Sequence, residues 1–169
     1  MSHEKSLVPY HLIKKHMYVS FLFLLITVIA GLIYSLQFLN LYPLKGIAFF
    51  SPARLRMVHT QGVAYAWLAN IFFALIYYML PKLTNRRVLC EKLGNFIFWA
   101  YNLLILLVVV FILAGYGQAL EWGETPIFLD PFLAICVVLF VVNVLTPVWK
   151  ARHEPYYVSV WYLIAGLIW

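Results

Sequence analysis

Four long apolar runs constrain what this chain can fold into more than any other feature. Each is close to or longer than the roughly 20 residues that a helix needs to cross a bilayer. A backbone inside lipid must satisfy its own hydrogen bonds, and this favours helices. We therefore predict an all-α, polytopic membrane protein with a single membrane domain over residues 1–169. The predicted spans are 18–39, 51–80, 96–116 and 132–148, and the shorter run 156–169 is the predicted start of a fifth helix.

Composition and charge agree with a membrane location. The chain is 65% hydrophobic and only 11% charged, which is too apolar for a soluble domain of this length. Its net charge of +6 comes from basic residues in the short connections between the apolar runs. Of the 12 lysines and arginines, nine lie in the N-terminal tail and in the connections 82–92 and 150–155. This distribution predicts membrane lipid rather than nucleic acid as a partner, and a cytoplasmic N-terminus.

The second span carries the residues of most chemical interest. Ser51 followed by Pro52 is a helix-start signal, and Pro81 is the predicted end of that helix. His59 is the only histidine that these boundaries place inside the membrane, where an ionisable group needs a partner. We therefore predict a metal or cofactor at His59.

Small residues follow His59 along one face of the helix. Gly62 and Ala66 lie three and seven residues beyond the histidine. They would allow a flat macrocycle to approach the helix closely, with His59 as its axial ligand. Close packing of two helices would need the same small residues, and spacing alone does not separate the two interpretations.

Charged residues suggest the surroundings of such a cofactor. Arg54 and Arg56 precede His59, and guanidinium groups pair with carboxylates such as haem propionates. The alternative is that both arginines extend to the lipid headgroups. Glu121 and Glu124 lie three residues apart in a connection, 118–131, that contains no lysine or arginine. Such a pair suits a hard cation, or it is ordinary solvated charge.

Three segments together resemble a known family. Residues 54–60, Arg-Leu-Arg-Met-Val-His-Thr, are similar to the second-helix motif in the large subunit of haem-copper oxidases, particularly the cbb-type cytochrome c oxidases and the related nitric oxide reductases. Residues 117–124 resemble an outer loop of that subunit, and residues 156–162 resemble the start of its fifth helix. The order and spacing of the segments agree along essentially the whole chain.

The resemblance implies roles for individual residues. It implies that His59 is an axial ligand of a low-spin haem b and that Arg54 and Arg56 contact the propionates. It also implies that Glu121 binds calcium, with Glu124 as a second candidate. In the family the ligands of copper and of the high-spin haem lie on later helices. We therefore expect them on a partner chain that completes a split large subunit, or on a missing continuation of this one.

The remaining histidines do not fit those ligand positions. They lie in the predicted tail or in a predicted cytoplasmic connection, and we expect them to be solvated surface residues. They are His3, His11, His16 and His153.

The resemblance also implies a function. We expect a haem b-binding subunit of a respiratory terminal oxidase in the bacterial inner membrane. It would carry electrons from cytochrome c to a dioxygen-reducing centre and would assemble with cytochrome c-type subunits. One alternative is a nitric oxide reductase fragment, which stays open because Met57 stands in place of a family proline, closer to the nitric oxide reductase form. The other is a structural or assembly subunit without haem.

Overall fold

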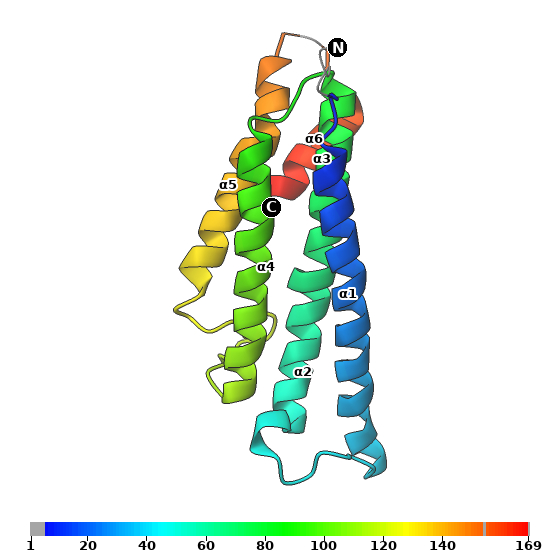
Figure 1. The fold of residues 1–169 in the computed structure, drawn as a ribbon, viewed down its shortest axis with the longest axis vertical. Coiled ribbons are helices and arrows are strands. Elements are labelled where there is room, and N and C mark those ends of the chain that lie inside the picture. The colour runs from blue at the N-terminus through cyan, green and yellow to red at the C-terminus, as the bar shows by residue number, and fades with distance from the viewer. Residues whose placement is uncertain (1–5, 154, 169) are drawn as a thin grey trace.

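The computed structural model describes residues 6–153 and 155–168, which form a bundle of membrane-length helices (Figure 1). Four helical rods are long and apolar enough to cross a membrane, as predicted. The first is α1 (Tyr10–Ser35) with the 3₁₀ turn η1 (Leu36–Leu39). The second joins α2 (Pro52–Gln61), the π-helical segment η3 (Gly62–Leu68) and α3 (Ala69–Thr84). The others are α4 (Glu91–Ala114) and α5 (Asp130–Lys150), followed by the short α6 (Val158–Ile168).

Three predicted boundaries are wrong by four residues or more, and one of them is the start of α4, which lies at Glu91 rather than at residue 96. The first helix begins at Tyr10 rather than at residue 18, because a stripe of buried residues continues to its N-terminal end, where Leu12 and His16 face protein. The second rod continues through Pro81 to Thr84. A proline in the last turn removes only one helical N–H donor. The rod ends where Asn85 adopts a left-handed conformation with φ 51°.

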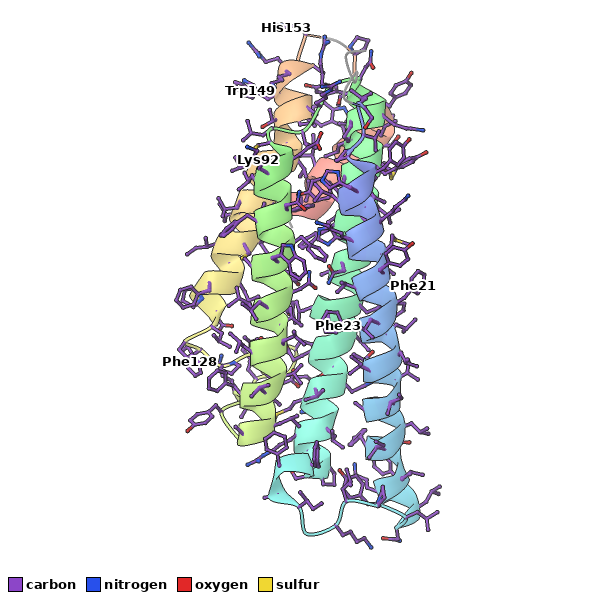
Figure 2. All side chains as sticks on the ribbon, in the orientation of Figure 1. Phe21, Phe23, Lys92, Phe128, Trp149 and His153 are labelled. Carbon is purple, nitrogen blue, oxygen red and sulfur yellow. The ribbon has the colours of Figure 1, made fainter. Side chains whose placement is uncertain are left out.

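The helices pack in two groups. α1 lies along the rod formed by α2, η3 and α3, while α4 packs on α5, and α6 contacts α3 and α5. Aromatic side chains join the groups at mid-bundle, where the ring of Phe73 lies 4.1 Å from that of Phe140. Figure 2 shows Phe23 directed between the helices and Phe21 directed outward, in agreement with exposures of 6% and 56%.

The bundle has two ends with different content. One, the N-terminal end, holds the start of α1, the end of α3, the start of α4 with Lys92, and the end of α5 with His153 just beyond it (Figure 2). The opposite end, which we call the His59 end, holds the start of α2, the connection 40–51 and the connection 115–129 with Phe128. The cytoplasmic location of the N-terminal end stays a prediction.

Candidate functional site

The start of α2 positions the predicted site. Ser51 is extended, with φ −60° and ψ 149°, and Pro52 occupies the first helical turn, as the sequence predicts. Ser51 makes no side-chain capping hydrogen bond. Because the helix begins here, Arg54, Arg56 and His59 all lie within the first turns of α2.

His59 is held by α1. Its Nδ1 lies 2.8 Å from the backbone carbonyl oxygen of Thr27. A carbonyl can only accept, so Nδ1 carries a proton, and in the neutral imidazole Nε2 then keeps its lone pair. The ring fits beside Gly31, where a Cβ would come within 2.6 Å of Nδ1. The imidazole remains half-buried. This geometry is typical of a metal-ligating histidine, whose second nitrogen almost always donates to a fixed acceptor.

Gly62 and Ala66 face protein rather than open space. A Cβ at Gly62 would overlap the methyl group of Thr27, so the glycine permits close contact between α1 and the second rod. Ala66 is fully buried in the main hydrophobic core. The geometry of both residues is that of close helix packing. A surface for a flat macrocycle at these two positions remains a prediction.

Arg54 reaches the C-terminal end of α4. Its Nη1 donates to the carbonyl of Leu113 at 2.6 Å, where a cation also compensates the helix dipole. The guanidinium lies against Gly115, whose φ of +103° and lack of a Cβ make room for it. A guanidinium has five N–H donors, so this contact leaves Arg54 further hydrogen-bonding capacity.

Arg56 belongs to a polar cluster centred on Glu124. The Glu124 carboxylate is only 1% exposed and lies 3.4 Å from Nη2 of Arg56. It accepts a hydrogen bond from Nε2 of Gln61 at 2.6 Å and from the hydroxyl of Thr60 at 3.3 Å. Thr125 in turn donates to Oε1 of Gln61 at 3.0 Å. The cluster therefore fastens the connection 115–129 to the start of α2.

The two predicted calcium ligands differ in their surroundings. Glu121 is exposed, whereas Glu124 is buried and already bonded. Both line one surface hollow of about 410 Å³, together with Arg56 and Gln118. Within the described ranges, no three histidine, cysteine, aspartate or glutamate side chains converge as a metal site.

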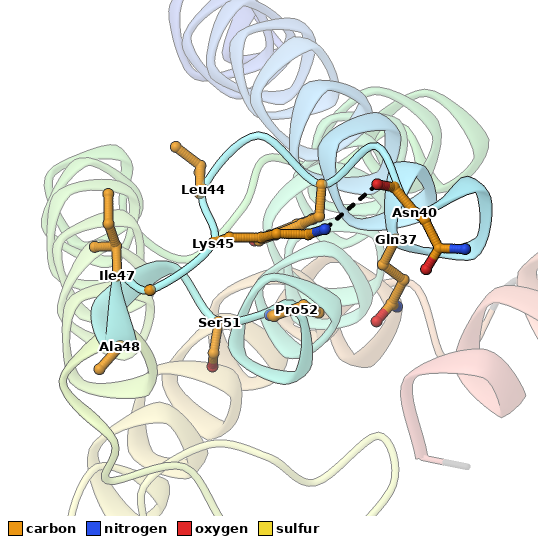
Figure 3. A pocket seen from close by; sticks show the side chains of 10 residues that line it. Gln37, Asn40, Leu44, Lys45, Ile47, Ala48, Ser51 and Pro52 are labelled. Carbon is orange, nitrogen blue, oxygen red and sulfur yellow. Dashed lines mark hydrogen bonds between the residues drawn. The ribbon is translucent and has the colours of Figure 1, made fainter.

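Another hollow of about 440 Å³ lies at the same end of the bundle, between the connection 40–51 and the start of α2 (Figure 3). Lys45 extends across it, with Nζ 3.5 Å from the carbonyl oxygen of Asn40. The residues that line this hollow include none of the predicted site. It is therefore separate from the surroundings of His59.

His16 contradicts the expectation of a solvated surface residue. It is a residue of α1 and is fully buried, so His59 is not the only intramembrane histidine. Its Nδ1 lies 2.7 Å from Oδ1 of Asn70, and the rings of Phe73 and Phe98 meet it edge-on. The expectation was wrong because it placed the first span too far along the chain.

The other histidines agree with the expectation, as far as they are described. His11 and His153 are exposed, and His3 lies outside the described residues. Cys90 and Cys136 are both free.

Sequence reasoning missed Thr27, Gly31 and Gln61 as parts of the site. Thr27 acts through its backbone carbonyl, which no side-chain pattern reveals. Gly31 is the one glycine in the predicted first span, and this was the available signal. Gln61 follows His59 by two residues and could have been noticed as a buried polar group near the membrane surface.

Comparison with known proteins gives consistent matches. A family model described as cytochrome C and quinol oxidase polypeptide I matches residues 11–169. The chain is 28% identical over 145 residues to a cytochrome c oxidase subunit 1 homolog of Agrobacterium tumefaciens, covering 83% of this chain and 26% of that protein. It is 28% identical over 115 residues to the cbb3-type cytochrome c oxidase subunit CcoN1 of Stutzerimonas stutzeri, covering 68% of this chain and 24% of that protein. The chain thus spans about a quarter of the length of these relatives.

Proposed function

Because the chain belongs to the cytochrome c and quinol oxidase polypeptide I family, we propose that it binds one side of a low-spin haem b within an oxidase large subunit. The predicted family resemblance is confirmed. Four apolar helices and bacterial relatives make the chain a multi-pass protein of the bacterial inner membrane, as predicted.

The observation that carries the proposal is the hydrogen bond from His59 to Thr27. It fixes the tautomer in which Nε2 can donate to iron, and it orients the ring before any ligand arrives. Haem b supplies a reversible one-electron change at its iron when bound. His59 would hold the iron from this chain, and residues on other helices of the large subunit would complete its coordination.

Arg54 and Arg56 support the same proposal. Both guanidinium groups lie near the start of the helix that carries His59, and each keeps donors beyond its contact with Leu113 or Glu124. They suit the two propionates of a haem. Positive charge beside the haem also favours its reduced state, so the arginines would tune the potential.

The wider role follows from the family. We propose that electrons reach the haem from cytochrome c-type subunits and pass to a dioxygen-reducing copper and high-spin haem centre, whose ligands lie on the remaining large-subunit helices. The relatives named as cytochrome c oxidases favour dioxygen over nitric oxide as the substrate. At the exposed carboxylate of Glu121 we propose a calcium site, with Glu124 holding Arg56. Calcium takes six to eight oxygen ligands, so further oxygens must complete it.

A haem assay tests the proposal. Protein purified from membranes in mild detergent, as wild type, His59→Ala and His11→Ala, is analysed by pyridine haemochrome and visible spectroscopy. We expect His59→Ala to lose low-spin haem b, whereas His11→Ala, which removes an exposed imidazole, retains it. An unchanged spectrum in His59→Ala would favour a structural or assembly subunit instead.

A further inference from the structure

The π-helical segment η3 lies in the second rod, directly after the helix that carries His59. It covers Gly62–Leu68 and separates α2, which carries His59, from α3, which carries Asn70. In π-helix each N–H bonds to the carbonyl five residues back rather than four, so the helix turns less per residue. His59 and Asn70 are 11 residues apart, and in an unbroken α-helix two residues at this spacing lie on nearly the same face. The segment therefore rotates α2 relative to α3.

The α3 side of this segment is firmly anchored. Asn70 is fully buried and contacts His16 on α1 at 2.7 Å and Asn102 on α4 at 3.0 Å. Because this half of the rod is fixed, a change in η3 must appear as a rotation of the outer half. That half carries His59, whose Nδ1 has to meet the carbonyl of Thr27.

Two tyrosine hydroxyl groups hold the segment itself. The hydroxyl of Tyr101 on α4 donates to the backbone carbonyl of Tyr65, in the middle of η3, at 2.7 Å. The hydroxyl of Tyr65 donates to the carbonyl of Trp122 at 2.9 Å. Tyr101 is only 3% exposed, so in a membrane its hydroxyl and the carbonyl that it meets depend on each other.

We propose that Tyr101 is a positioning residue that keeps η3 in π geometry and thereby directs His59 toward Thr27. The proposal rests on the haem-ligand role of His59 proposed above. In the part of the chain that the structure describes, Tyr101 bonds to Tyr65 and His59 bonds to Thr27, so Tyr101 acts on His59 only through the helix. The side chain of Tyr65 adds a second contact to the same turn, because its hydroxyl bonds to the connection 115–129.

The test compares Tyr101→Phe with Tyr77→Phe. Both substitutions remove one buried hydroxyl and keep the ring, but the hydroxyl of Tyr77 meets Asn143 at 3.2 Å, away from η3. Backbone amide exchange across residues 59–68 is measured by mass spectrometry, and the low-spin haem is followed by its electron paramagnetic resonance. We expect Tyr101→Phe to raise exchange in η3 at least fivefold and to shift the g-values. Tyr77→Phe should change neither.

The outcomes are distinct. Faster exchange in η3 with unchanged g-values would show that Tyr101 holds η3 but does not position His59. No change in either measurement would overturn both parts of the proposal. If wild type holds no haem b, the proposed function fails. Diethyl pyrocarbonate modification of His59 in that haem-free protein then decides the positioning alone. A rate at least threefold higher in Tyr101→Phe supports it, and an equal rate overturns it.

Discussion

Two of the histidines in the membrane-length helices, His16 and His59, occupy opposite kinds of environment. His59, near the start of α2, donates to a backbone carbonyl of α1 and stays half-buried. His16, in α1, meets the side chain of Asn70 and is enclosed by Phe73 and Phe98 with no exposed surface. Both rings use Nδ1 for their hydrogen bond. Access to the second nitrogen is therefore what separates a candidate ligand from a histidine of the packed interior.

The largest expected effect on stability is at His16. His16→Ala leaves a cavity and removes the partner of Asn70, so we expect a loss of about 2–4 kcal/mol. The visible spectrum of any retained haem b should not change, because His16 lies at the other end of the bundle. Thermal unfolding in detergent measures the first effect and spectroscopy the second. A lost haem signal at unchanged stability would contradict the distinction between the two histidines.

Prediction from sequence was good for the rods and poor for the contacts between them. Hydropathy predicted four spans because each run contains a long stretch of high mean hydropathy. It misplaced the start of α1 because the boundary depends on which residues face protein, as Leu12 and His16 do. The ligand candidate His59 came from its type and position, whereas Thr27 contributes a backbone atom. The bond between Glu124 and Gln61 joins distant parts of the chain, so no local pattern contains it.

A substitution at Gly31 tests the His59 half of the comparison with His16. A Cβ in Gly31→Ala would lie 2.6 Å from Nδ1 of His59 and push the ring away from Thr27. Loss of an orienting partner of this kind typically weakens metal affinity about 10- to 100-fold. We expect a corresponding loss of haem b during purification, measured as haem per protein. Ala30→Gly, at the neighbouring position, is the control and should retain haem.

Glu124 allows a smaller effect to be measured at the same end. Glu124→Gln removes the charge that faces Arg56 but keeps an oxygen and an amide near Gln61 and Thr60. Because Arg56 is 36% exposed, water compensates part of the loss. We expect a destabilisation of about 1–2 kcal/mol, seen as a lower midpoint of thermal unfolding. A stability equal to wild type would show that the cluster does not fasten the connection 115–129.

The smallest effect is expected at Glu121. Its side chain is exposed, and the structure places it beside the hollow rather than within the cluster. Glu121→Gln should change unfolding by less than about 0.5 kcal/mol in the presence of a chelator. If Glu121 binds calcium, added calcium should stabilise wild type but not the variant. Equal stabilisation of both proteins would remove Glu121 from the proposed site.

The double contact of Thr27 limits how the helices can move. Its carbonyl accepts the hydrogen bond from His59, and its methyl group packs against Gly62. This one residue of α1 therefore fixes both the position of the second rod along α1 and the distance between the two rods. Sliding α1 by a single turn, about 5.4 Å, would break both contacts at once. Any displacement that preserves them must carry α1 and α2 together as a rigid pair, and whatever His59 binds would travel with them.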